Sequence, residues 1–128
     1  MNEVTKTIIA LIILFVLVVG VVYSFNTRKN VRLKNDPAFP KYVYSSDKSL
    51  LSYRIAITIP DVLKKLPCTC GCSMIGHTSN ADCFFTGHGF GPHAAHCDIC
   101  QDIAIDAFKL YKNGYSTDKI NNFILEKY

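Results

Sequence analysis

The sequence from residue 67 to residue 100 reads PCTCGCSMIGHTSNADCFFTGHGFGPHAAHCDIC, and it contains all six cysteines and all four histidines of the 128-residue chain. Residues 67–92 include five glycines and show no apolar periodicity, so neither a helix nor a strand is predicted there. A loop of this length is uncommon in a small domain unless something organises it. We therefore expect this segment to be folded by the bonds of its cysteines, either to a metal or in disulfides.

The first cysteine motif places three cysteines at alternate positions: Cys68, Cys70 and Cys72. Alternate side chains of an extended chain lie on one side, about 6.5–7 Å apart, and Gly71 allows a turn that brings the sulfurs closer. Disulfides between such near neighbours would be strained. Three thiolates that converge on one soft cation, or bridge two, are easier to build. His77 and Cys83 follow closely and could complete the ligand set.

The second motif combines histidine and cysteine on a helix that is predicted to begin at Pro92. At about 100° per residue, four side chains fall within one arc of the helix surface. They are His93, His96, Cys97 and Cys100. In the first turns the helix dipole is expected to lower the pKa of cysteine. The pattern predicts a helix face made of metal ligands, whereas His88 lies between two glycines and is predicted to be a loop residue.

Ligand softness decides which metal the sequence favours. Thiolate-rich sites select Cu(I), Zn²⁺ or iron–sulfur clusters. Six thiols exceed what one tetrahedral zinc requires, and their spacing matches neither a zinc ribbon nor a ferredoxin. Copper as Cu(I) is therefore the first expectation and zinc the second. A framework of three disulfides remains an alternative that explains the even number of cysteines but not the histidines.

The N-terminal region is predicted to cross a membrane. No charged residue occurs from Thr7 to Thr27, and this run is long enough for a hydrocarbon core of about 30 Å. Tyr23 and Phe25 stand where an aromatic belt would lie. A cleaved signal peptide is the rival interpretation, but its n-region would be nearly neutral and no small-residue cleavage site follows. We expect an uncleaved anchor over residues 1–27.

Basic residues directly follow the predicted anchor: Arg28, Lys29, Arg32 and Lys34. Charge alone would place them, and the domain behind them, in the cytoplasm. Much of the net charge of +4 comes from this basic stretch, and contact with anionic lipid head groups explains the stretch more simply than nucleic acid does. No basic patch is interleaved with aromatic residues elsewhere, so the sequence predicts a lipid bilayer as partner and excludes nucleic acid.

The rest of the chain divides into a linker over residues 28–46, with Pro37 and Pro40, and a soluble domain over residues 47–128. About three helices are expected in the domain, and helical patterns are found from Asp47, from Pro60 to Leu66, from Pro92 to about Asn113, and from Ser116 or Thr117 to the end. A strand is the alternative for residues 55–59, which are rich in β-branched side chains. The fold class is thus mainly α, and a domain this small often needs a metal or disulfides for stability.

Several short motifs occur together in the soluble domain: Pro60-x-x-Leu63, Pro67-Cys68-x-Cys70-Gly71-Cys72, Gly76-His77-x-Ser79, Cys83-Phe84 and His93-Ala94-x-x-Cys97-x-x-Cys100. With these motifs, the chain resembles the PCYCGC-motif family of bacterial and archaeal proteins over about residues 50–125. The departures are Thr69, where the family has Tyr, and Ser73, where Gly is frequent. The resemblance implies a membrane-anchored or lipid-anchored protein of uncharacterised function, with an extracytoplasmic domain. We give this implication more weight than the charge rule.

Three functional hypotheses follow. The first is an anchored protein that holds or delivers copper at the cell surface. The second is thiol–disulfide exchange at Cys97 and Cys100, because residues 97–128 resemble loosely the helical thiol domain of cytochrome c maturation reductases. The third is an accessory subunit of a membrane complex with a structural zinc. A membrane complex or a metal-receiving protein is the candidate partner. No hydrolase arrangement is found, so an enzyme is the less favoured class.

Overall fold

The computed structural model describes residues 2–26 and 31–128, with side chains of the first helix described as far as Tyr23. That helix, α1, spans Glu3–Asn26, and its stretch Glu3–Tyr23 is long and apolar enough to cross a membrane. All of its described side chains are exposed. The predicted positions of Arg28, Lys29 and the Phe25 side chain lie outside the described parts of the chain. A signal sequence near the N-terminus can meet the same criteria of length and composition.

The second helix confirms the helical alternative for residues 47–58. Helix α2 spans Asp47–Thr58, and the Ser46 hydroxyl caps it by accepting a hydrogen bond from the Ser49 backbone N–H at 3.0 Å. Its buried residues recur at helical spacing, which outweighs the β-branched composition: Ser49, Ser52, Tyr53, Ile55 and Ala56. Pro60 then opens the short helix α3, Pro60–Leu63, which ends three residues earlier than predicted.

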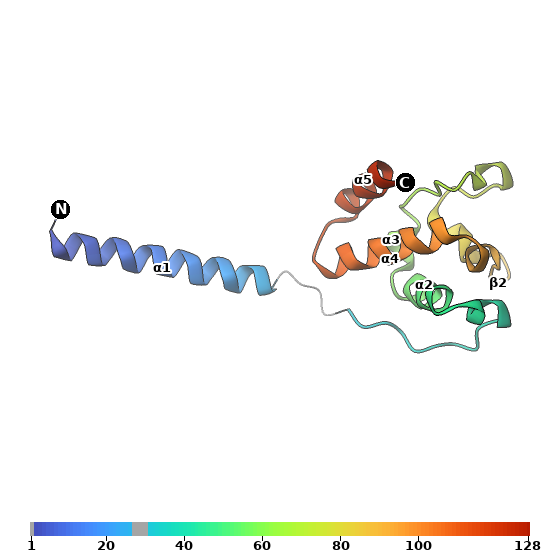
Figure 1. Cartoon of the computed structure of the whole chain (residues 1–128), viewed down its shortest axis with the longest axis horizontal. Helices are drawn as coiled ribbons and strands as arrows, with labels where there is room; N and C mark the ends of the chain where they lie inside the picture. Colours follow the sequence, from blue (N-terminus) through green and yellow to red (C-terminus); the bar gives the residue numbers. More distant parts are fainter. Residues whose placement is uncertain (1, 27–30) are drawn as a thin grey trace.

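The two C-terminal helices complete the main layer of the domain. Helix α4 spans Asp98–Lys112 and α5 spans Thr117–Lys127, with α2 and α5 both packed against α4 (Figure 1). Gly114 takes a positive φ of +85° between them, and the Ser116 hydroxyl accepts from the Lys119 N–H at 3.4 Å to begin α5. Ile103 and Ala107 of α4 and Ile120 and Ile124 of α5 are buried in the core.

Helix α4 begins at Asp98, so the predicted helix start at Pro92 is wrong. Residues His93–His96 form a separate 3₁₀ turn, η4, and Cys97 is extended (φ −124°, ψ 99°) at the N-cap of α4. The Gln101 side-chain amide donates to the Ala94 carbonyl at 2.7 Å and so connects the first turn of α4 to η4. Asp98 in the first turn favours a new helix start there because its charge complements the helix dipole.

Short elements build the segment where no regular structure was predicted. They are the 3₁₀ turns η2 (Cys72–Ile75) and η3 (Asn80–Cys83) and the antiparallel pair of strands β1 (Phe85–Thr86) and β2 (Gly89–Phe90). Each is too short to leave a periodic pattern in the sequence.

The core reaches into the predicted linker. Within residues 28–46, the 3₁₀ turn η1 spans Lys41–Ser45, and Phe39 and Val43 are buried. The Phe39 ring packs edge-on against Phe90, at 5.0 Å between centroids, and against Tyr53 at 6.2 Å. This stretch therefore closes one side of the domain and runs beside α2 (Figure 1).

Candidate metal centre

The loop that carries the first cysteine motif is shaped by two glycines. Gly71 (φ +81°) and Gly76 (φ +86°) lie on either side of η2, in left-handed backbone conformations that other residues rarely adopt. The turn at Gly71 folds the chain back between Cys70 and Cys72, whose sulfurs lie 2.8 Å apart. The alternate cysteines thus converge as the sequence analysis expected.

Cys83 is brought to this loop by the turn η3. The Asp82 carboxylate accepts hydrogen bonds from the backbone N–H groups of Thr78 and Ser79, both at 2.8 Å, and thereby fixes the turn. The Asn80 N–H donates to the Leu66 carbonyl at 2.8 Å, which ties the turn to the residue just before the cysteine loop. Cys83 is fully buried as a result.

The start of α4 supplies the remaining two cysteines. Cys97 is at the N-cap and Cys100 follows in the first turn, fully buried. The side-chain amide of Asn80 donates to the Cys100 carbonyl at 3.2 Å, so η3 and α4 are held together next to their cysteines. Asn80 and Gln101 were not predicted as positioning residues, because nothing in the local sequence shows which distant carbonyls they would reach.

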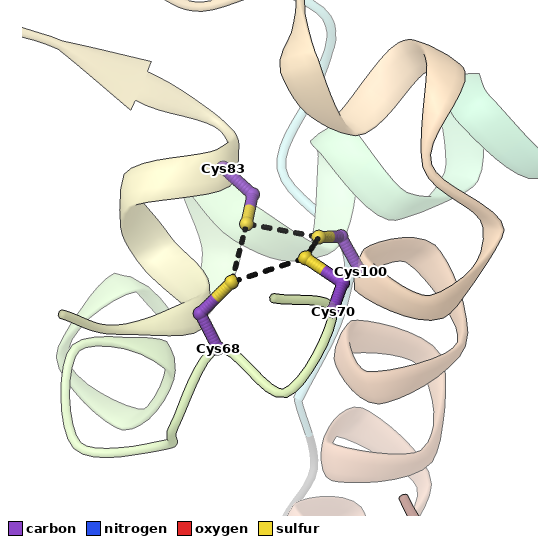
Figure 2. Close-up of side chains that lie close together, drawn as sticks. All are labelled: Cys68, Cys70, Cys83 and Cys100. Atoms are coloured by element: carbon purple, nitrogen blue, oxygen red, sulfur yellow. Dashed lines mark hydrogen bonds between the residues drawn. The ribbon is translucent and has the colours of Figure 1, made fainter. Parts of the chain in front are cut away.

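Four sulfurs from these three segments form a compact group, which Figure 2 shows with all four sulfurs pointing toward one another. The successive Sγ–Sγ distances are 3.2 Å (Cys68 to Cys70), 3.4 Å (Cys70 to Cys100), 2.9 Å (Cys100 to Cys83) and 3.5 Å (Cys83 to Cys68). A Zn²⁺–thiolate tetrahedron with bonds of about 2.3 Å has edges of about 3.8 Å. Small outward shifts of the sulfurs would therefore fit one metal ion.

A second group of ligands overlaps the first. Cys70, His93, Cys97 and Cys100 offer ligand atoms that all lie within 4.8 Å of one another. His93 is placed by η4, so the broken helix still brings it to the cysteines, although not on one helix face. The structure thus joins the two predicted motifs into one cluster.

The outer side of the cluster carries Cys72 and His77. The Cys72 sulfur lies 2.9 Å from Nε2 of His93, and Nδ1 of His77 lies 3.6 Å from the Cys83 sulfur. The two histidine rings are in edge-on contact, 5.0 Å between centroids. Cys72 and His77 are half-buried, whereas residues 73–76 between them are exposed.

Two histidines remain apart from the cluster. His96 is exposed and, among the described residues, belongs to none of the groups that could hold a metal, although the sequence predicted it as a ligand. It was placed on the ligand face by assuming a continuous helix from Pro92, and the break at Cys97 removes that register. His88 is exposed between β1 and β2, as the glycines around it indicated.

Crowding governs protonation in the cluster. The pKa of Cys100 is raised by the hydrogen bond with the neighbouring Cys83 thiol and by burial. The lowering of this pKa that was expected from the helix dipole therefore does not dominate. Burial, followed by the nearby His77, lowers the pKa of His93 and favours the neutral imidazole that can bind a metal. All six cysteines are free thiols in the structure, so the disulfide framework is not the state described.

Fold and site together define a small, mostly helical protein with a cysteine- and histidine-rich cluster that could hold a metal ion. The chain belongs to the family described as proteins of unknown function with a PCYCGC motif, whose family model matches residues 27–128. This match confirms the resemblance seen in the motifs and extends it toward the N-terminus. No curated protein and no solved structure matches the chain.

Proposed function

We propose that this protein is anchored in a membrane and binds soft metal ions, Cu(I) first, which it holds or hands over at the cell surface. The observation that carries the proposal is the cluster itself, in which the six thiols and two imidazoles form overlapping groups with ligand atoms within 4.8 Å. Thiolate and imidazole are the ligands that copper and zinc select, whereas the hard ions calcium and magnesium prefer oxygen.

The number of ligands supports copper over zinc. A structural zinc needs four ligands in a closed tetrahedron, which Cys68, Cys70, Cys83 and Cys100 alone could supply. The further thiols and imidazoles would then be surplus. Cu(I) is soft and tolerates low coordination and shared thiolates, so it can use a cluster with more sulfur than one tetrahedron requires.

The gradient of burial supports transfer as well as storage. Cys83 and Cys100 are fully buried, whereas Cys72 and His77 are half-buried next to the exposed residues 73–76. An ion could reach the inner thiols by exchanging one ligand at a time from this accessible side. A purely structural site is normally closed. A metal-receiving protein, or a membrane complex that contains one, is the partner that this arrangement fits.

The location rests on the first helix and on the family. The length and composition of α1 support a single-pass anchor in the lipid bilayer. The PCYCGC family resemblance supports an extracytoplasmic domain. Thiol–disulfide exchange at Cys97 and Cys100 is less well supported, because the Cys100 sulfur lies 2.9 Å from that of Cys83 and 3.4 Å from that of Cys70, so these two cysteines are part of a larger thiol cluster and not a separate pair.

Anaerobic purification in detergent, followed by elemental analysis and thiol counting, tests the proposal. Bound copper, thiols protected from alkylation and transfer to a Cu(I)-selective chelator are the expected results. The exposed His88→Ala variant is a matched control that should retain the copper. Metal-free protein with one reducible Cys97–Cys100 bridge would establish the redox function instead. Zinc that resists exchange for copper and whose removal unfolds the domain would establish a structural site.

A further inference from the structure

Two thiols occupy a special position in the cluster. Cys70 and Cys100 are the residues shared by the group with Cys68 and Cys83 and by the group with His93 and Cys97. Their sulfurs lie 3.4 Å apart. Cys70 also contacts the sulfurs of Cys68 at 3.2 Å and Cys72 at 2.8 Å, and it is therefore central among the thiols.

We infer that the cluster binds a pair of soft metal ions bridged by the thiolates of Cys70 and Cys100. This inference rests on the proposed function, since it assumes that the cluster holds metal at all. One ion takes Cys68 and Cys83 as its own ligands, and the other takes His93 and Cys97. Each ion then has four ligands, although the protein supplies only six, because the two bridging sulfurs serve both.

The spacing of the bridging sulfurs allows this arrangement. With metal–sulfur bonds of about 2.3 Å and bridging sulfurs 3.4 Å apart, two ions that share this edge lie about 3.1 Å from each other. The terminal ligands of the two ions come from different segments: Cys68 and Cys83 from the cysteine loop and η3, His93 and Cys97 from η4 and the N-cap of α4.

Bridging also fits the close packing of the thiols around Cys70 and Cys100. Cys100 is fully buried, and its sulfur lies 2.9 Å from that of Cys83 and 3.4 Å from that of Cys70. A single bound cation would leave the negative charge of these thiolates only partly balanced. Two cations that share Cys70 and Cys100 place positive charge on both sides of these central thiolates. Cys72 and His77 lie outside both four-ligand groups and are free to act as the outer, exchanging ligands.

Cobalt titration of the reduced full-length protein in detergent tests the inference, because Co²⁺ is a spectroscopic probe for tetrahedral thiolate sites. We expect two Co²⁺ per chain, with thiolate charge-transfer absorption from both. The electron paramagnetic resonance signal per cobalt should fall as the second ion binds, because bridging thiolates couple the two spins.

Variants assign the two positions. Cys97→Ser should lower the capacity from two Co²⁺ to one and abolish the coupling, and Cys68→Ser should do the same from the other side. Met74→Ser is the matched control, since it removes an exposed sulfur-containing side chain of the same loop that belongs to none of the metal groups, and it should keep two coupled ions. Circular dichroism of each variant separates loss of a ligand from loss of the fold.

The possible failures are distinct. One Co²⁺ per chain in the wild type would overturn the bridged pair and leave the proposed metal-binding function standing. Two Co²⁺ with an undiminished signal per cobalt would overturn the bridge. Two coupled Co²⁺ retained in Cys97→Ser would overturn the assignment of ligands. Failure to bind either Co²⁺ or Cu(I) would overturn the proposed function together with the inference.

Discussion

Replacing Gln101 by Met tests how the domain holds its second group of ligands. The Gln101 amide donates at 2.7 Å to the carbonyl of Ala94, and both residues are buried. Met has a similar length but no donor, so the carbonyl is left buried without this partner. The Cys97 backbone N–H still donates to this carbonyl at 3.3 Å, so losing the Gln101 hydrogen bond should cost about 0.5–1.5 kcal/mol. For a domain of this size each kcal/mol lowers Tm by about 4–8 °C.

The same change should act on metal binding in a selective way. The hydrogen bond joins η4, which carries His93, to the first turn of α4, which carries Cys100. Looser placement of His93 weakens binding of the second ion, whereas the group of four cysteines does not include this residue. We expect the first Co²⁺ to bind as in the wild type and the second to bind more weakly.

Thermal unfolding of the reduced, metal-free protein and Co²⁺ titration of the same samples measure the two effects. Lys119→Met on the exposed side of α5 is the control and should change the free energy of unfolding by less than about 0.5 kcal/mol. An unchanged Tm for Gln101→Met, or equal weakening of both ions, would refute the reasoning.

Three further predictions concern the scaffold and the anchor. Tyr53→Phe removes a buried hydrogen bond to the Gly91 carbonyl at 2.5 Å and should cost about 1–3 kcal/mol in urea unfolding; a cost below that of Tyr42→Phe, whose bond to Phe90 is only partly buried, would contradict this. Although burial opposes its ionisation, hydrogen bonds from Lys127, Lys109 and Tyr128 lower the pKa of Asp106 below its usual 3.8. The contribution of the Asp106 carboxylate to stability is therefore present above about pH 4 and is lost as the pH falls through the lowered pKa. Replacing Asp106 by Asn should flatten the acid side of a plot of the free energy of unfolding against pH. An unchanged slope would show that other carboxylates dominate. The full chain should resist carbonate extraction from membranes, and protease added to intact cells should digest residues 31–128; a protected domain would place it in the cytoplasm.

Much of the helical framework could be predicted from local signals. Ser46 and Ser116 each precede an apolar helical pattern and cap the helices α2 and α5. Gly114 ends α4 within one residue of the predicted place. These features depend on residues that are neighbours along the chain, so the sequence is sufficient to find them.

The start of α4 could not be predicted in the same way. Pro92 is a good first residue of a helix, and Cys97 is not among the usual N-cap residues, so local preference favoured the earlier start. The bond from Gln101 to Ala94 and the ion pair of Lys48 with Asp98, at 3.0 Å, come from tertiary packing. The same limit explains why the buried Phe39 was assigned to a linker.

For the site, spacing predicted which residues gather but not which of them share an ion. Cys68, Cys70 and Cys72 converge because of Gly71, which is a local effect. The contacts of Cys83 and Cys70 with Cys100 join positions 17 and 30 residues apart and depend on how η3 packs against α4. His96 was predicted as a ligand because a continuous helix from Pro92 would place it on the same face as Cys97 and Cys100, and the break at Cys97 removes that alignment.

The cluster joins three separate segments of the chain, and this has a consequence for the lifetime of the protein. An ion bound to Cys68, Cys83 and Cys100 would cross-link the cysteine loop, η3 and α4, and the bond would exist only in the folded domain. At a free metal concentration of about 1,000 times Kd, such linkage adds about 4 kcal/mol to the free energy of unfolding. Proteases cut the unfolded form, so the abundance of the domain would rise and fall with the metal supply. A cell could then adjust how much of this protein it displays without any change in its synthesis.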